Sequence, residues 1–163
     1  EIAIESALTG HLVFSTLHTN DAAGAVTRLQ DMGVEGYLIS SSLLAIQAQR
    51  LVRRVCTECA ETHPLSLDEA RVLDIDSAEC AEIRRGKGCE RCGQTGYRGR
   101  VGLYELLLMS DEIRHQIASG ADANSIRDTA IKGGMRTLRQ DALEKLRAGL
   151  TTPEEVVRVT RAV

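Results

Sequence analysis

The sequence predicts a mixed α/β chain in three parts, and three observations support this prediction. Apolar residues follow alternating helix and strand patterns over residues 1–55, which is typical of one edge of a parallel sheet. Two paired cysteine motifs and four glycines lie within residues 56–97, a pattern that indicates a metal-binding module. Residues 98–163 begin with a strand pattern and continue with helix-capping signals, which favours a small helical subdomain.

The first part is expected to hold three helices and two strands. Gly10 and Gly33 each follow a helix pattern, and glycine adopts the left-handed conformation that commonly terminates a helix. Thr19, Asn20 and Asp21 are residues that favour an N-cap position. The elements expected from apolar periodicity are, in order, a helix over 1–9, a strand over 11–17, helices over 22–32 and 37–48, and a strand over 49–55.

The other two parts contain explicit helix-start signals. Ser66 and Glu69 have the spacing of a capping box, in which each side chain accepts a backbone N–H of the first turn. The segment Thr152-Pro153-Glu154-Glu155 combines a cap, a proline at the first helical position and a glutamate at the third. The remaining elements expected are a strand over 101–109 and helices over 110–119, 124–132 and 137–148.

The strongest chemical signal is the pair of motifs Cys56-x-x-Cys59 and Cys89-x-x-Cys92. A two-residue gap lets two thiolates turn onto one ion, and two such motifs complete a tetrahedral shell of four sulfurs. Ligand softness and geometry favour zinc over iron. Since all four positions are protein ligands, the zinc is expected to be structural rather than catalytic. The alternative of disulfides is disfavoured because the sequence shows no secretory signal.

Two residues near these motifs are expected to lie outside the metal shell. Cys80 is the fifth cysteine and is predicted to be an ordinary thiol. His63 would be a fifth ligand in a complete site, and a solvent-exposed position is therefore predicted for it.

Charge and composition exclude some classes of function. The formal net charge is -3, without a strongly basic segment, and aromatic residues make up 2% of the chain, so nucleic acid is not expected as a partner. No apolar run reaches the roughly 18 residues of a membrane span. Residues 84–100 nevertheless carry basic side chains against Glu90 alone. These cations offset the charge of a four-thiolate zinc site or form a partner-binding face, and the two roles are compatible.

A polar segment, Ser15–Asn20, follows the first strand pattern. Ligands of open α/β sheets bind beyond the carboxyl ends of strands, so these side chains are candidates to contact phosphate or position water. The simpler alternative is that the segment only caps the next helix. The sequence contains no G-x-x-x-x-G-K-[ST] loop, so this chain by itself is not expected to hydrolyse nucleotide. It begins on Glu1 inside an apolar pattern, which predicts a piece of a longer protein.

The stretch Thr9–Asn20 (TGHLVFSTLHTN) resembles the His box of the secretion ATPases, which are the E proteins of type II secretion and the extension ATPases of type IV pili. The resemblance continues in order over nearly the whole chain, and the four-cysteine insert belongs to this subset of the family. Ser40–Ser42 and the tail are more similar to the type II secretion branch. The other matching segments are 38–44, 48–53, 96–100 and 104–107.

The resemblance implies the C-terminal part of a RecA-like P-loop ATPase domain, with a zinc-binding insert and a small helical subdomain. It implies a homo-hexameric motor that uses ATP and Mg²⁺ to power type II protein secretion across the outer membrane. The alternatives are a type IV pilus assembly ATPase and a non-catalytic zinc-containing docking module. The implied location is cytoplasmic, peripheral to the bacterial inner membrane, with contacts to inner-membrane secretion platform proteins. Because the Walker motifs would precede Glu1, the isolated piece is expected to be inactive.

The resemblance also implies roles for individual residues. His18 would be the catalytic His-box histidine near the γ-phosphate, and Thr16, Thr19 and His11 would be nucleotide-proximal. Arg28 is equally compatible with a structural role and with a subunit interface. The three interface candidates are Arg28, Arg98 and Arg100.

Overall fold

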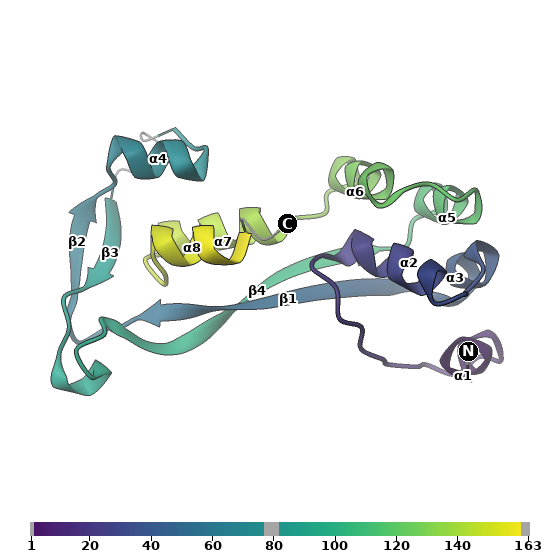
Figure 1. The fold of residues 1–163 in the computed structure, drawn as a ribbon, viewed down its shortest axis with the longest axis horizontal. Coiled ribbons are helices and arrows are strands. Elements are labelled where there is room, and N and C mark those ends of the chain that lie inside the picture. Colours follow the sequence, from purple (N-terminus) through teal and green to yellow (C-terminus); the bar gives the residue numbers. More distant parts are fainter. Residues whose placement is uncertain (1, 77–81, 161–163) are drawn as a thin grey trace. The chain divides into compact units, whose positions relative to one another are not determined.

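The computed structural model describes residues 2–76 and 82–160, and it has the mixed α/β class that the sequence predicts (Figure 1). The described chain forms two compact units. Unit 1 combines the residues up to Ala48 with Glu105–Thr137, and unit 2 combines Gln49–Tyr104 with the residues from Leu138 onward. The prediction for Cys80 lies outside the described residues.

Most helices begin at the residues that the sequence signals predict. Asp21 caps the second helix by accepting the Gly24 N–H, and Ser110 caps the fifth by accepting the Ile113 N–H. The helices are α1 (Ile2–Leu8), α2 (Ala22–Asp31), α3 (Gly36–Ser42), α4 (Leu67–Leu73), α5 (Asp111–Ala118), α6 (Ala123–Lys132), α7 (Leu138–Arg147) and α8 (Pro153–Thr160). α4 starts with the predicted capping box of Ser66 and Glu69.

The strands pair two by two. The 11-residue β1 (Ala45–Val55) pairs with β4 (Tyr97–Leu108). The Cys56 N–H donates to the Gly96 carbonyl beside one end of this pair, and the Met109 N–H donates to the Leu44 carbonyl beside the other, so β1 and β4 run antiparallel (Figure 1). β2 (Ala60–Pro64) and β3 (Glu82–Gly86) form a second antiparallel pair. The expectation of a parallel sheet edge is therefore wrong for the described strands.

Two element predictions in the first part are wrong. Residues 11–19 form no regular structure. With the described residues, the backbone groups of residues 12–19 make no backbone–backbone hydrogen bond, and a strand is stable only when a neighbour pairs with it. The helix expected over 37–48 ends at Ser42, and residues from Ala45 onward belong to β1. Pairing with β4 outweighs the helix propensity of this stretch.

The core of unit 1 lies between its segment of β4 and the helices α2, α3, α5 and α6. Leu107 points into the core together with apolar side chains of α2, α3, α5 and α6. α3 and α5 approach closely, since a Cβ added at Gly36 would lie 2.6 Å from the Ile117 carbonyl oxygen. The fully buried large side chains of this unit include Val26, Ile39, Leu107, Ile117 and Ile126. No helix within the described ranges is both long and apolar enough to cross a membrane.

Unit 2 has its own core between β1, β4 and the helices α4, α7 and α8. Its fully buried large side chains include Val52, Leu73, Ile83, Leu103, Leu146 and Val156. The helices that follow β4 are thus shared between the two units, α5 and α6 in unit 1 and α7 and α8 in unit 2. The division of the sequence into 1–55, 56–97 and 98–163 stays a prediction. The two compact units follow different boundaries.

Candidate functional site

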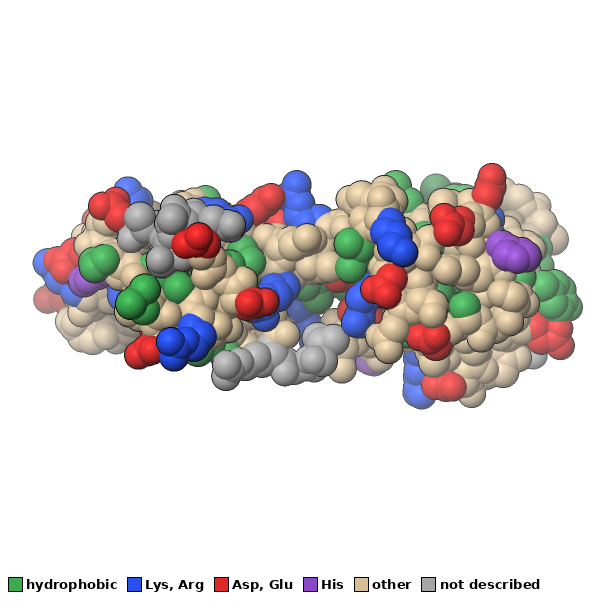
Figure 2. Space-filling view, turned by 90° about the horizontal axis from the view of Figure 1, so that it is seen from above, with side chains coloured by type: hydrophobic (Ala, Val, Ile, Leu, Met, Phe, Trp, Pro, Cys, Tyr) green, Lys and Arg blue, Asp and Glu red, His purple; other side chains and the backbone are tan. Residues whose placement is uncertain are grey.

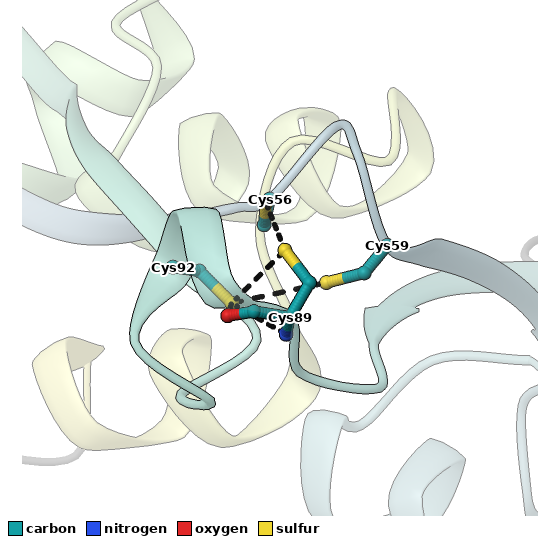
Figure 3. A group of neighbouring side chains, drawn as sticks. All are labelled: Cys56, Cys59, Cys89 and Cys92. Atoms are coloured by element: carbon teal, nitrogen blue, oxygen red, sulfur yellow. Dashed lines mark hydrogen bonds between the residues drawn. The ribbon is translucent and has the colours of Figure 1, made fainter.

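The four cysteines of the paired motifs converge in unit 2 (Figure 3). Cys56 follows β1 directly and Cys59 precedes β2, while Cys89 precedes the short 3₁₀ helix η2 (Glu90–Cys92) and Cys92 is its last residue. All four Sγ atoms lie within 4.8 Å of one another. Cys56, Cys59 and Cys92 are buried and Cys89 is partly buried. The fold therefore brings together the two Cys-x-x-Cys motifs that the sequence predicts as metal ligands.

The spacing of the sulfurs fits one tetrahedral metal ion. With metal–sulfur bonds of about 2.3 Å, a regular tetrahedron places neighbouring sulfurs about 3.8 Å apart. The Sγ–Sγ distances are 3.9 Å for Cys56–Cys89, 3.9 Å for Cys59–Cys92 and 3.7 Å for Cys89–Cys92. Disulfide bonds would need sulfurs about 2.05 Å apart. The four side chains could therefore hold a metal ion.

Two backbone N–H groups point at the sulfur of Cys92. The N–H groups of Cys89 and Gly96 donate to the Cys92 Sγ at 3.2 and 3.3 Å. Gly93 closes η2 with a left-handed φ of 59°, a conformation that glycine adopts at low cost. Donors aimed at a sulfur stabilise its negative charge, which is the form that binds metal.

The surroundings of the cysteines give their thiols different acidities. Burial raises the pKa of the Cys59 thiol to about 12, because a buried thiolate is poorly solvated. Burial acts in the same direction on Cys92, but the N–H groups of Cys89 and Gly96 outweigh it and lower the pKa of that thiol to about 6. These donors therefore favour the thiolate form of Cys92, which is the form that binds metal.

Two glycines allow the strands beside the cluster to approach. A Cβ added at Gly86 would overlap the Gly96 carbonyl oxygen, and Gly96 itself has a left-handed φ of 76°. The Gly96 carbonyl accepts the Cys56 N–H at 2.9 Å, and the Lys87 N–H donates to the Cys59 carbonyl at 3.0 Å. These two backbone hydrogen bonds link the segment of the first Cys-x-x-Cys motif to the residues on either side of the second motif.

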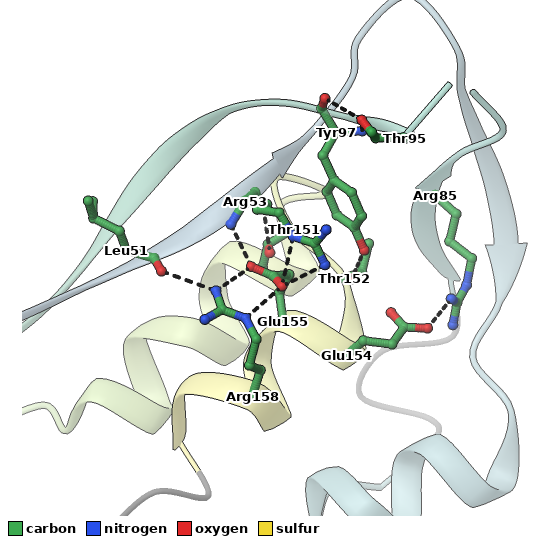
Figure 4. Close-up of polar contacts among 10 residues, drawn as sticks. All are labelled: Leu51, Arg53, Arg85, Thr95, Tyr97, Thr151, Thr152, Glu154, Glu155 and Arg158. Atoms are coloured by element: carbon green, nitrogen blue, oxygen red, sulfur yellow. Dashed lines mark hydrogen bonds and ion pairs between the residues drawn. The ribbon is translucent and has the colours of Figure 1, made fainter. Parts of the chain in front are cut away.

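The basic residues around the cluster have different surroundings. Arg85 of β3 pairs with Glu154 of α8 (Figure 4). Arg85 also pairs with Glu69 of α4, and Lys87 pairs with Glu61 at 2.8 Å. The interface candidates Arg98 and Arg100 are exposed on β4. In the face shown in Figure 2, Lys and Arg side chains are interspersed with Asp and Glu.

A buried carboxylate, Glu155, holds α8 against β1 (Figure 4). Glu155 is 0% exposed and accepts the Arg53 N–H at 2.7 Å, the Arg53 side chain at 3.0 Å and the Arg158 side chain at 2.7 Å. The Arg53 guanidinium also lies 4.1 Å from the centre of the Tyr97 ring, a cation–π distance. The sequence identifies Glu155 only as the glutamate of the helix-start motif of α8, and that motif does not indicate the contact with Arg53 of β1.

The histidine segment, residues 11–19 of unit 1, is largely exposed. His18 and Thr16 are exposed, whereas Thr19 is partly buried and donates its hydroxyl to the Asp21 carbonyl at 3.1 Å. His11 lies 3.2 Å from the Thr9 hydroxyl and the Ser6 carbonyl at the end of α1. Among the described residues, no hydrogen bond joins His18 to Thr16, Thr19 or His11.

Two buried carboxylates hold the start of α2, directly after the histidine segment. Asp21 accepts the Gly24 N–H at 2.7 Å and pairs with Arg127 of α6. Glu105 of β4 accepts the Ala22 N–H at 2.9 Å. Negative charge is favourable at this end of a helix, where N–H groups lack partners. The sequence analysis predicts a cap at Thr19–Asp21 but not the contribution of Glu105.

The remaining sequence candidates occupy the surface or a partly buried position. Arg28 is exposed on α2, and the structure joins it to no other candidate residue. His63 on β2 is partly buried rather than fully exposed. Its predicted exposure is therefore only partly met, because it lies in the β2–β3 pair.

Nearly the whole chain is similar to proteins of secretion and pilus machinery. The family described as "Type II/IV secretion system protein" matches residues 1–158. The type IV pilus assembly ATPase PilB of Thermus thermophilus is 52% identical over 159 residues, which are 96% of this chain and 18% of that protein. The type II secretion system ATPase E of Vibrio cholerae serotype O1 is 47% identical over 161 residues, which are 99% of this chain and 32% of that protein. The chain therefore spans a third or less of these relatives.

A solved structure has a similar fold. The crystal structure of the pilus retraction motor PilT with bound ADP aligns with a TM-score of 0.59 at 24% identity, over 96% of this chain and 36% of that chain. This likeness shows a shared fold, and the family match runs from residue 1 through the His-box stretch and the cysteine cluster into α8. The chain therefore belongs to the type II/IV secretion system protein family.

Proposed function

We propose that this chain is the C-terminal part of a motor ATPase that powers type II protein secretion across the outer membrane. The observation that carries the proposal is the family match over residues 1–158, together with 47% identity to a protein named type II secretion system ATPase E. ATP and Mg²⁺ are the substrate and cofactor of the complete protein. The 163 residues contain no P-loop motif, and this chain alone is inactive in the proposal.

In the proposed mechanism the histidine segment lies near the nucleotide. His18 hydrogen-bonds the γ-phosphate and reports its loss on hydrolysis, with Thr16, Thr19 and His11 close by. The exposure of His18 supports this role, because an exposed imidazole is free to meet a ligand bound elsewhere in the complete protein.

The experiment is ATP turnover of the full-length protein with His18→Ala. We expect kcat to fall by about 100-fold or more, the range for loss of a group that acts in the transition state. His115→Ala is a matched control, because His115 is an exposed histidine of unit 1 on α5. Unchanged turnover in His18→Ala with a folded protein would remove the catalytic role.

We further propose that the four-cysteine cluster holds one structural zinc ion. Four thiolates at tetrahedral spacing satisfy the coordination of zinc and leave no position for a reacting water. The ion would fix the junction of β1 and β4 without taking part in hydrolysis.

The complete protein would act as a homo-hexamer on the cytoplasmic side of the bacterial inner membrane, attached through secretion platform proteins. The exposed Arg28, Arg98 and Arg100 are candidates for subunit or platform contacts, and nucleic acid is not a proposed partner. Charge reversal of Arg98 together with Arg100 should weaken hexamer formation or platform binding in a pull-down. An unchanged result in both assays would remove these two residues from the interface.

A second candidate function is type IV pilus assembly. It is favoured by the 52% identity to the pilus assembly ATPase PilB. Deletion of the full-length gene separates the two, since the first function predicts loss of a secreted protein with pili intact and the second predicts the reverse. A third candidate, a zinc-containing docking module without catalysis, predicts a full-length protein that shows no ATP turnover.

A further inference from the structure

The first turn of α2 is attached to the rest of unit 1 by two buried carboxylates. Asp21 is 7% exposed and Glu105 is 3% exposed. Asp21 belongs to the chain that enters α2, whereas Glu105 lies 83 residues away from Ala22, on β4. The two acids satisfy the N–H groups of Gly24 and Ala22, which are among those that lack partners at a helix start.

Glu105 occupies a position where the strand pattern calls for an apolar side chain. β4 alternates between the core and solvent, and its inward positions are Leu103, Glu105 and Leu107. A buried carboxylate is costly unless it accepts hydrogen bonds. The contact that Glu105 makes with Ala22 therefore gives this residue a specific task, which is to hold the start of α2 against β4.

The histidine segment enters α2 at this same point. Thr19 donates its hydroxyl to the Asp21 carbonyl at 3.1 Å, and Ala22 is the next residue along the chain. Arg127 of α6 pairs with the Asp21 carboxylate from the other side. His18 thus shortly precedes the cap that these contacts hold, while residues 12–18 have no backbone–backbone hydrogen bond with the described residues.

We propose that Glu105 is a positioning residue for His18. The proposal rests on the role of His18 given under Proposed function. Glu105 acts through the Ala22 N–H: it fixes the first turn of α2, and this turn fixes where the histidine segment leaves the scaffold. Glu105 itself does not touch the nucleotide.

The test measures single-turnover hydrolysis of MgATP by the full-length protein and its variants. Glu105→Ala should lower the single-turnover rate by about tenfold or more, because a displaced His18 no longer meets the γ-phosphate in the geometry that the reaction needs. Glu105→Gln keeps an oxygen that accepts the Ala22 N–H and should restore the rate to within about threefold. A rate for Glu105→Gln as low as that of Glu105→Ala would overturn the hydrogen-bond role.

The double variant His18→Ala/Glu105→Ala separates positioning from a loss of stability. Residues that act as one unit are non-additive, so the double variant should be no slower than His18→Ala alone. Asp141→Ala is the matched control, because Asp141 is a buried carboxylate in unit 2 that accepts the Tyr104 N–H at 2.9 Å and pairs with Lys145. Its effect should multiply with that of His18→Ala.

The outcomes distinguish this proposal from the one on which it rests. If His18→Ala turns over normally, the role of His18 fails, and Glu105 has nothing to position. If His18→Ala is slow but Glu105→Ala is normal, or if the two effects multiply, the role of His18 stands and the positioning role of Glu105 is overturned.

Discussion

The four-cysteine cluster of unit 2 and the histidine segment of unit 1 are held by the fold to very different degrees. The cysteines lie next to paired strands, and backbone hydrogen bonds join Cys56 to Gly96 and Cys59 to Lys87. Within the part of the chain that the structure describes, the histidine segment is hydrogen-bonded only near its ends, by His11 to Ser6 and by Thr19 to Asp21. The cluster is therefore organised by contacts within this chain, whereas the histidine segment is positioned mainly by where α2 begins.

The largest expected effect concerns the metal. Cys92→Ser should reduce bound zinc from one ion per chain to none and destabilise unit 2 by several kcal/mol, since binding of a structural zinc is worth on the order of 10 kcal/mol. Elemental analysis after dialysis and thermal unfolding would measure both quantities. Cys80→Ser is the control and should keep its metal. A folded, metal-free wild-type chain would contradict the assignment.

The next effect is the pH dependence that Glu155 gives to unit 2. Burial alone would raise the pKa of this carboxyl, but hydrogen bonds from Arg158 and Arg53 outweigh burial and hold the pKa at about 2. A pKa below its unfolded value stabilises the fold above about pH 4.3, and this stabilisation is lost as pH falls toward 2. The contribution at neutral pH is about 3 kcal/mol, because a tenfold change in an acid dissociation constant corresponds to about 1.4 kcal/mol.

Glu155→Gln would test this contribution by unfolding at several pH values. The variant should be less stable than the wild type at pH 7, and the difference should shrink between about pH 5 and pH 2. Glu58→Gln, at an exposed position of unit 2, should change stability by less than about 0.5 kcal/mol. A constant difference between wild type and Glu155→Gln across this range would show that the carboxylate charge is not what holds α8.

A smaller effect is expected from the close approach of two backbones beside the cluster. Gly86→Ala places a methyl group against the Gly96 carbonyl and should cost about 1–3 kcal/mol, the range for overpacking. It should also weaken metal retention against a chelator, because the Gly96 N–H donates to the Cys92 Sγ. Gly93→Ala is the matched control, since its Cβ would meet nothing within 4 Å and only its left-handed φ is strained. Equal metal loss in both variants would exclude the steric explanation.

The smallest effect is expected in the histidine segment. Phe14 is 89% exposed, so Phe14→Ser should change the free energy of unfolding of the 163-residue chain by less than about 0.5 kcal/mol. Leu107→Ala, at a fully buried position of unit 1, should cost about 2–5 kcal/mol under the same conditions. Comparable losses in the two variants would mean that the segment packs on the chain and would remove the contrast between the two regions.

Much of the local structure could be predicted from the sequence. Asp21, Ser66 and Ser110 cap helices where their spacing indicates, because capping depends on neighbours a few residues away. The two Cys-x-x-Cys motifs were equally predictable, because two ligands separated by two residues can reach the same ion in a short turn. These features require little information from distant parts of the chain.

The errors fall where distant pairing decides the outcome. Residues 11–17 have the composition of a strand, but the described chain offers them no paired neighbour. Ala45–Ala48 have helix-forming residues, but β4 pairs with them. The β2 and β3 strands have no clear apolar alternation, and their pairing across the cysteine module was therefore not predictable from periodicity.

The sequence by itself determined the helix starts, the ligand set of the metal centre and the family resemblance, because each depends on residue types at short spacing. The tertiary structure alone decided the antiparallel partner of β1, the burial of Glu155 and the contact between Glu105 and the start of α2. These contacts join residues up to 102 positions apart. For the two glutamates, the physical reason is that a buried carboxylate must find donors wherever the packed fold provides them. For β1, it is that the backbone groups of a strand need a neighbouring strand to pair with.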